Sequence, residues 1–291
     1  MSVPSRLAHA FLLLAVLPWR VAAQPIPAAE GGAGAPAREV RQQVGAAINN
    51  AGLQAVTELA WRWPSGRSGH PLRRGAHTAL GVVHVLTPSM DRVGGWMQWA
   101  PLSILSVRAG VEPALYFGTF HSVQTFPGYD APFDADTRSA GVAGRRAIGL
   151  RSYVSPAFQA RLGPVAVRTT ADVEWWRVNL AGPRYYEPAR DALLATRGDA
   201  LLNMTSVVLY QHERLAGGSS AAGVLHHLMR VFDAPQNRVQ RLGLIGMHEF
   251  AGRPLRLPHL TVTATAWRYL DDPSKRDEWG AAASLGVRFV R

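Results

Sequence analysis

The chain has 291 residues and a formal net charge of +11; 47% of its residues are hydrophobic and 18% are charged. It contains no cysteine, which excludes disulfide bonds and cysteine-based metal sites. Beyond the N-terminal segment there is no apolar run of about 18 residues, the length of a transmembrane helix. Any insertion of the mature chain into a membrane must therefore use strands.

The N-terminal segment 1–23 has the features of a secretory signal peptide. Arg6 gives it a positive start, an apolar core follows over Ala8–Trp19, and small residues favour cleavage after Ala23. The core of about 10–12 residues is too short for a membrane helix of roughly 20. An uncleaved N-terminal anchor is the alternative. The next residues, 24–37, are rich in Pro, Gly and Ala and predict a flexible leader.

Residues 38–291 predict a single all-β domain. Hydrophobic and polar residues alternate over most of this segment, and a period of two requires an extended chain with successive side chains on opposite faces. We expect about twelve strands, with ten as the alternative. The clearest strands cover Leu53–Trp63, Leu105–Phe117, Ile148–Leu162, Val165–Trp175, Leu260–Tyr269 and the last residues, 279–291; weaker ones cover roughly 38–48, 75–87, 92–100, 200–212, 220–232 and 238–250.

The last strand illustrates the two faces that these strands present. One face is apolar, whereas the other carries small residues and a single arginine. In the best strands the uncharged face is about 9–11 residues long, which is the length that a tilted strand needs to cross hydrocarbon. The apolar face of the last strand is Trp279, Ala281, Ala283, Leu285, Val287 and Phe289, and the opposite face is Gly280, Ala282, Ser284, Gly286 and Arg288.

The connections between the expected strands differ in length. Short links such as Gly163-Pro164 and Ala100–Ser103 fall at one end of the strands, and the long ones, about 119–142 and 179–199, fall at the other. Short turns on one rim and long loops on the other are typical of outer-membrane barrels. Within the second long connection, the segment Ala189–Arg197 is expected to form a short helix.

A sheet that is exposed to lipid has no water to satisfy its edges, so it must close on itself. We therefore predict a closed antiparallel up-and-down transmembrane β-barrel. The pattern over roughly 38–291 resembles the bacterial outer-membrane β-barrel proteins, although no specific family motif is present. These proteins commonly end on an amphipathic strand with a terminal aromatic residue; here Phe289 is followed by Val290 and Arg291. The resemblance implies location in the bacterial outer membrane and recognition by the outer-membrane assembly machinery.

Aromatic residues gather near the ends of the expected strands, often as neighbours in sequence, such as Trp175 with Trp176 and Trp267 near Tyr269. Amphipathic rings at strand ends suit the interfacial girdle of a membrane barrel. The girdle that we predict comprises Trp61, Trp63, Trp99, Phe117, Trp175 and Phe289.

Charged residues on the polar faces of the strands are expected to line the lumen. Two interpretations are open: an ion-pair ladder that plugs a narrow barrel, because buried arginines need carboxylate partners, or a basic pore or cavity that favours anions. The predicted lumen residues are Glu58, Arg62, Arg108, Glu112, Arg151, Arg161, Arg168, Asp172, Glu174 and Arg288.

These features favour a non-enzymatic, porin-like small pore or an envelope scaffold with a charged, partly plugged lumen. One alternative is an outer-membrane lipid hydrolase, because the outer-membrane phospholipase and lipid A deacylases are similar in strand number and present a Ser–His pair at the rim. The phospholipase motif, with His two residues before Ser, is not found; His121 and Ser122 are adjacent. The other alternative is a secreted soluble β-barrel that binds a ligand, since its strands alternate too.

No cofactor or metal site is predicted. Nucleotide fingerprints and zinc-ligand spacings are lacking in the sequence. Asp130, Asp134 and Asp136 share one loop, but their spacing is not that of a calcium loop, so we interpret them as solvated. Basic residues are dispersed, which argues against nucleic acid as a partner. Membrane lipid and lipopolysaccharide phosphate suit the basic rims by charge attraction.

Overall fold

The computed structural model describes residues 36–48, 52–65, 71–73, 75–119, 123–141, 144–215, 218–250 and 257–290. The predicted signal peptide, most of the leader, and His121 with Ser122 lie outside the described residues. Within those ranges, no helix is long and apolar enough to cross a membrane.

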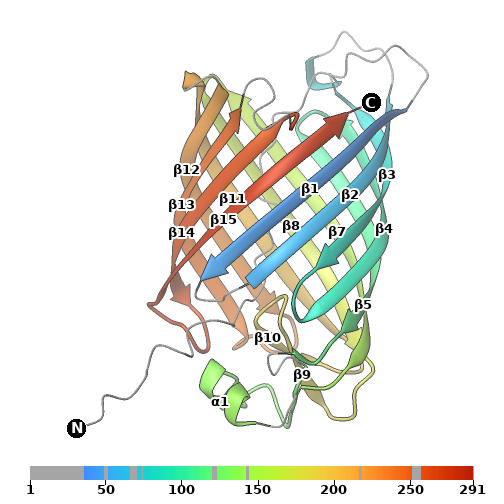
Figure 1. Cartoon of the computed structure of the whole chain (residues 1–291), viewed down its shortest axis with the longest axis vertical. Helices are drawn as coiled ribbons and strands as arrows, with labels where there is room; N and C mark the ends of the chain where they lie inside the picture. The colour runs from blue at the N-terminus through green and yellow to red at the C-terminus, as the bar shows by residue number, and fades with distance from the viewer. Residues whose placement is uncertain are drawn as a thin grey trace.

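Twelve antiparallel strands form one closed barrel, as the sequence predicts, and each strand pairs with its neighbours in chain order (Figure 1). The barrel closes where the first strand pairs with the last, with Val40 opposite Phe289 and Ile48 opposite Ala281. The strands are β1 (Ala37–Ile48), β2 (Gly52–Pro64), β3 (His77–Leu86), β4 (Met90–Leu102), β5 (Leu105–Tyr116), β7 (Ala147–Leu162), β8 (Val165–Val178), β11 (Asp199–Leu215), β12 (Gly218–Val231), β13 (Arg238–Phe250), β14 (Leu260–Asp271) and β15 (Trp279–Val290).

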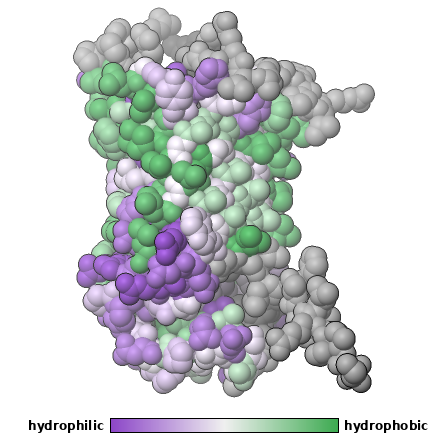
Figure 2. Space-filling model, turned by 90° about the vertical axis from the view of Figure 1, so that its left-hand side faces the viewer, coloured by the Kyte–Doolittle hydropathy of each residue, from purple (hydrophilic) through white to green (hydrophobic). Residues whose placement is uncertain are grey.

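The apolar faces of the strands form the outside of the barrel, here called the outer wall. The opposite faces line the lumen with charged and polar residues and with apolar clusters such as Val207, Leu225 and Ile245. Strand β15 shows the division: Leu285 is 54% exposed, whereas Ser284 and Arg288 on its other face are buried. Large apolar side chains such as Leu244 and Val224 are also exposed on the outer wall. Figure 2 shows hydrophobic residues over much of the upper and middle wall and hydrophilic residues toward the lower end. A water-soluble barrel would have the reverse arrangement.

The glycines of the lumen face explain why the last strand carries small residues there. Gly280 lies directly opposite Trp267 on β14, and a Cβ at Gly280 would overlap the indole ring. The same pairing joins Gly81 to Trp96 on β4, where an added Cβ would again overlap the indole. Large inward rings therefore fill the lumen above the bare backbone of the neighbouring strand, a device that also fixes strand register.

The two ends of the barrel differ. The terminal end holds the start of β1, the end of β15 and the two-residue turns at 103–104 and 163–164. The cap end holds the two longest connections, 117–146 and 179–198, so the predicted asymmetry of the loops is confirmed. Residues from these two connections form a cap of their own, drawn at the bottom of Figure 1.

The cap contains a three-stranded sheet in the order β10-β9-β6 and one short helix. Its elements are β6 (Thr125–Phe126), α1 (Ala135–Ala140), β9 (Arg184–Glu187) and β10 (Ala192–Ala195). The helix that we expected over Ala189–Arg197 is wrong, because β10 pairs with β9 inside that range. Its residues Leu193 and Leu194 are fully buried, and this tertiary burial outweighs the local preference for a helix.

Candidate functional site

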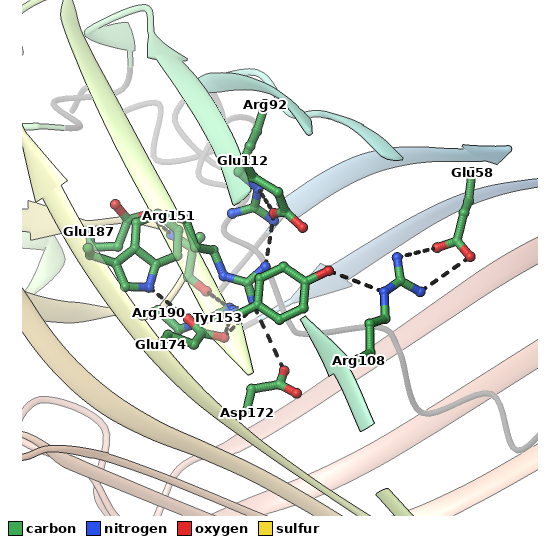
Figure 3. A network of polar contacts seen from close by, with 12 residues as sticks. Glu58, Arg92, Arg108, Glu112, Arg151, Tyr153, Asp172, Glu174, Glu187 and Arg190 are labelled. Atoms are coloured by element: carbon green, nitrogen blue, oxygen red, sulfur yellow. Dashed lines mark hydrogen bonds and ion pairs between the residues drawn. The ribbon is translucent and has the colours of Figure 1, made fainter. Parts of the chain in front are cut away.

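A network of buried ion pairs crosses the lumen in its cap half (Figure 3). At its centre, Arg151 on β7 donates from Nη1 to Glu112 Oε2 at 2.9 Å and from Nη2 to Glu174 Oε1 at 2.6 Å. Arg151 is 1% exposed, and the two glutamates are 0% exposed. Asp172 lies 3.9 Å from the same guanidinium and accepts a hydrogen bond from Ser155.

Two further arginines complete this network from opposite sides. Arg92 on β4 lies 2.7 Å from Glu112. Arg190, in the turn between β9 and β10 of the cap, donates to both oxygens of Glu174 at 2.8 and 2.6 Å. Trp176 Nε1 also donates to Glu174, at 2.7 Å. With Arg151 and Asp172, the ion-pair network comprises three arginines and three carboxylates, so it is electrically balanced across the described residues.

The network continues toward the terminal half through Tyr153. The Arg151 guanidinium stacks on the Tyr153 ring at 4.1 Å, and the Tyr153 hydroxyl accepts from Arg108 Nε at 3.2 Å. Arg108 also donates to both oxygens of Glu58 at 3.3 and 3.0 Å, and it stacks on the Trp96 ring at 3.6 Å. Charged and aromatic side chains thus alternate across the width of the barrel (Figure 3).

The cap is packed into the barrel rather than laid over it. Tyr185 and Leu194 of the cap share one apolar cluster with Trp176, Leu201 and Trp267 of the barrel strands. A second cluster, of Phe126, Phe133, Tyr186 and Leu193, holds the cap itself together. Buried apolar contact on this scale is the main source of cohesion between packed elements.

Polar contacts also tie the cap to the loops of the cap end. Asp191 forms an ion pair with Lys275 in the connection between β14 and β15, and it accepts a hydrogen bond from the Tyr186 hydroxyl at 2.7 Å. Burial alone would raise the pKa of Asp191, but the Lys275 ammonium and these hydrogen bonds lower it to about 2. The Tyr129 hydroxyl donates to Asp199 Oδ2 at 2.6 Å. The cap is therefore attached to two separate parts of the barrel end, the β14–β15 connection and the start of β11.

The terminal half of the lumen, in contrast, contains a cavity of about 280 Å³. Its walls reach from the ion-pair network to the terminal rim, where Leu105 at the start of β5 and His259 before β14 are among the lining residues. Eight arginines and only three carboxylates line it among the described residues. Amide and hydroxyl side chains, such as Gln98, Gln159 and Thr263, supply most of the remaining polar surface.

The structure places nine of the ten predicted lumen residues on the lumen face. Glu112, Arg151, Asp172 and Glu174 belong to the ion-pair network. Arg161 is the exception: it is exposed at the terminal rim, where Nε donates to the Gly163 carbonyl at 3.0 Å, so it does not line the cavity. The predicted residues that line the cavity are Glu58, Arg62, Arg108, Arg151, Arg168, Asp172 and Arg288.

The predicted aromatic girdle is also mostly on the outer wall. Trp63, Trp99, Trp175 and Phe289 are exposed there, Trp61 lies half-buried on the same face of β2 as Trp63, and Phe117 is half-buried just beyond β5. The aromatic neighbours that the sequence also suggested for the girdle are instead in the lumen. The buried ones are Trp96, Tyr116, Trp176, Trp267 and Tyr269. Trp175 and Trp176 are adjacent and point to opposite faces of β8, so only Trp175 reaches the outside, whereas Trp267 and Tyr269 are two residues apart and share the lumen face.

Sequence reasoning missed four charged residues of this site, Glu39, Arg41, Arg92 and Arg190. Arg92 is the first residue of the weaker strand expected over 92–100. Glu39 and Arg41 lie on the lumen face of β1, and the alternation of that weaker strand was sufficient to find them. Arg190 lies in a turn of the cap, where no periodicity marks its direction. Only the folded cap places it against Glu174.

One Ser–His pair is present on the outer wall at the terminal end. Ser220 on β12 lies opposite His248 on β13, with Oγ and Nδ1 2.8 Å apart. The His248 Nε2 atom is buried and has no hydrogen-bond partner among the described residues, so no carboxylate orients the ring there. Another hydrogen-bonded pair of the outer wall, Thr169 with Ser206 at 3.0 Å, shows that such cross-strand contacts are not confined to one place.

Comparison with known proteins gives neither a matching family model nor a matching curated protein. Solved outer-membrane barrels are similar in fold. The beta domain of the Bordetella autotransporter BrkA aligns over 89% of this chain and 100% of its own, with 15% identity and a TM-score of 0.44. The NanC porin aligns over 86% and 98%, with 10% identity and a TM-score of 0.39. The COG4313 outer membrane channel of Pseudomonas putida F1 aligns over 91% and 99%, with 11% identity and a TM-score of 0.36.

The fold is that of an outer-membrane β-barrel. The closed twelve-stranded topology, the apolar outer wall and the charged lumen support this conclusion.

Proposed function

We propose that the protein is a non-enzymatic barrel of the bacterial outer membrane that is closed to ions and serves as an envelope scaffold displaying its cap. The observation that carries this proposal is the ion-pair network. Its central arginine and both glutamates are nearly or fully buried, and the cap contributes Arg190 to it. A path for hydrated ions has to displace these groups, each of which is expensive to leave unpaired in a dry interior.

The orientation follows from the two ends. Outer-membrane barrels have short turns on the periplasmic side and longer loops outside. The terminal end therefore faces the periplasm, and the cap faces the exterior. The hydrophilic surface around the cap end suits a part that extends beyond the hydrocarbon (Figure 2).

Ion conductance across planar lipid bilayers tests closure of the lumen. We expect no steady conductance from the folded protein. Arg190→Ala removes the cap's contribution to the network, and we expect intermittent conductance from it because Glu174 loses two hydrogen bonds. Heat-modifiable gel mobility identifies folded variants. A steady, ohmic conductance of the unmodified protein would contradict the proposal.

The membrane location is tested by placing arginine at two positions of one face of β8. Val173 lies well inside the strand, whereas Val165 begins it at the terminal rim. At a bilayer midplane an arginine costs ~2–4 kcal/mol, and near the interface it costs ~0–1 kcal/mol. We therefore expect Val173→Arg to lower the free energy of unfolding in lipid vesicles much more than Val165→Arg. Equal small costs would indicate a wall in water.

A second candidate function is hydrolysis of membrane lipid, because Ser220 and His248 are within hydrogen-bond distance on the outer wall. A serine next to a histidine base is the minimal arrangement for nucleophilic attack on an acyl ester. Labelling by a fluorophosphonate probe tests it, with loss of the label in Ser220→Ala and His248→Gln. Ser206→Ala, on the same wall, is the matched control. Without labelling of the unmodified protein, this candidate is dismissed.

Membrane lipid, lipopolysaccharide and the outer-membrane assembly machinery are the partners that we propose. Arg177 and Arg230 support lipopolysaccharide, because both are exposed on the outer wall near the cap end and have no ion-pair partner in the described part of the chain. Lipid phosphate attracts such residues. Lipopolysaccharide should raise the melting temperature of the unmodified protein more than that of Arg177→Gln with Arg230→Gln. Equal shifts would count against this contact.

A further inference from the structure

We propose that the cavity of the terminal half binds a small molecule that carries phosphate or carboxylate groups and arrives from the periplasmic side. The inference rests on the proposed function in one respect: closure at the cap end makes the cavity a blind pocket rather than part of a channel. The groups that we assign to the ligand are the guanidiniums of Arg62 and Arg288, with Arg41 beside them.

Outside the ion-pair network, the lining of the cavity has an excess of arginines over carboxylates. Within the lining of the cavity, the network supplies Arg92, Arg151, Arg190 and Asp172, and it is balanced together with Glu112 and Glu174 behind them. The rest of the described lining has five arginines against two carboxylates. These are Arg41, Arg62, Arg108, Arg168 and Arg288 against Glu39 and Glu58.

Each of these two carboxylates already has an arginine partner. Glu58 is occupied by Arg108 through two hydrogen bonds. Glu39 serves two arginines, Arg41 in a close contact and Arg62 at 3.5 Å. A carboxylate that is shared in this way satisfies neither guanidinium fully, since each presents five donors.

The strand register brings two of these arginines together. Arg41 on β1 lies directly opposite Arg288 on β15, and both point into the lumen. Like charges directly opposite on neighbouring strands destabilise a sheet. The carboxylate near Arg288 is Glu249, 3.8 Å away, which also lies 3.4 Å from His259. An oxyanion between the two arginines converts their repulsion into two attractive contacts.

The chemistry and the size of the pocket narrow the ligand. Guanidinium groups match the paired oxygens of phosphate and carboxylate with two parallel hydrogen bonds. Drug-sized ligands occupy pockets of roughly 300–1,000 Å³, and the cavity, at about 280 Å³, suits a smaller solute. Hydroxyl and amide groups such as Ser284 and Gln43, which are hydrogen-bonded to each other at 3.1 Å, provide neutral partners beside the charges.

Isothermal titration calorimetry on the folded protein in detergent tests the site with two probes, pyrophosphate and citrate. We expect saturable binding of at least one probe, weakened by added salt. The double variant Arg62→Gln with Arg288→Gln should bind that probe at least about tenfold more weakly, because two charge-assisted contacts are lost. Binding of pyrophosphate alone identifies a phosphate ligand, and binding of citrate alone identifies a carboxylate ligand.

The matched control is Arg238→Gln. Arg238 also lies opposite an arginine, Arg230, but on the outer wall rather than in the lumen. Its affinity for the probe should equal that of the unmodified protein, and gel mobility checks that each variant is folded. Saturable heat from neither probe, or equal affinity in the double variant, overturns the assignment. A conducting barrel that still binds the probe would refute closure while leaving the site standing.

Discussion

The two halves of the lumen use the same residue, arginine, in different ways. In the cap half, Arg151 is held between Glu112 and Glu174, and the charges balance. In the terminal half, Arg41 and Arg62 share Glu39, and arginines outnumber the carboxylates. The first arrangement fills space and closes the barrel. The second leaves both space and uncompensated charge.

The role of an inward-facing charge therefore depends on how many oppositely charged partners it has. A guanidinium that has its own buried carboxylates is part of the packing, and its removal damages the fold. A guanidinium that shares a carboxylate at the edge of water remains available to a ligand. We therefore expect substitution of an arginine to destabilise the fold strongly in the cap half and only slightly in the terminal half.

The largest effect is expected for Arg151→Ala. This change leaves Glu112 and Glu174 buried without their common partner, and breaking a buried pair in this way costs ~3–5 kcal/mol. Urea unfolding in lipid vesicles, followed by tryptophan fluorescence, measures it. Arg62→Ala is the matched change in the terminal half and should cost less than about 1 kcal/mol. Equal costs would remove the distinction between the halves.

The next effect concerns the attachment of the cap. Asp191 has a pKa of about 2 in the folded chain, below the ordinary value of 3.8, and a shift of this size corresponds to roughly 2–3 kcal/mol. Because the folded pKa is lowered, this stability is complete above about pH 4 and is lost as the pH falls through about 2.

Asp191→Asn should therefore lower the unfolding free energy at neutral pH and remove the part of the acid dependence that lies between about pH 4 and pH 2. Unfolding curves across that range check it. Asp136→Asn is the control, because Asp136 is exposed in the first turn of helix α1 and has no contact with the barrel among the described residues. An unchanged acid profile in Asp191→Asn would show that the pair with Lys275 does not hold the cap.

The barrel was predictable because its walls separate two environments. Strand β13 was expected over 238–250 and β8 from Val165, and both begin there in the structure. The best strands have a lipid-length apolar face, and the period of two makes the direction of each side chain readable, as for Glu112 and Glu174. The same rule, applied strictly to Trp175 and Trp176, places only the first outside.

The cap and its part of the site were not predictable in this way. Strands β6, β9 and β10 have two to four residues each, too few to show a period. Their structure depends on burial in the barrel end, as the wrongly expected helix over Ala189–Arg197 illustrates. The partners of Arg190 and the sharing of Glu39 follow from distances across the lumen, which no spacing in the sequence encodes.

A smaller effect separates the halves through two glycines on the same face of β15. A Cβ at Gly280 overlaps the Trp267 ring, whereas one at Gly286 meets only the Gln42 carbonyl oxygen, at 3.9 Å. Gly280→Ala should cost about 1–2 kcal/mol through overpacking. Gly286→Ala should be neutral or stabilise the fold by up to about 1 kcal/mol, because the unfolded chain loses freedom. Unfolding in urea compares them, and a larger cost at Gly286 would mean that the terminal half is filled as well.

The smallest expected effect, that of Arg288→Gln, distinguishes most sharply between a structural role and a ligand-binding role for an arginine. Arg288→Gln removes a charge that lies opposite Arg41, so the repulsion between them disappears while the contact with Glu249, at 3.8 Å, is weak. The free energy of unfolding should change by less than about 1 kcal/mol, with stabilisation as the expected sign. With pyrophosphate or citrate present, the sign should reverse for the probe that binds, since the unmodified protein gains stability from it and the variant gains less. Melting temperatures measured with and without each probe test this prediction. A loss of several kcal/mol in the free energy of unfolding without any probe would place Arg288 with the structural arginines of the cap half.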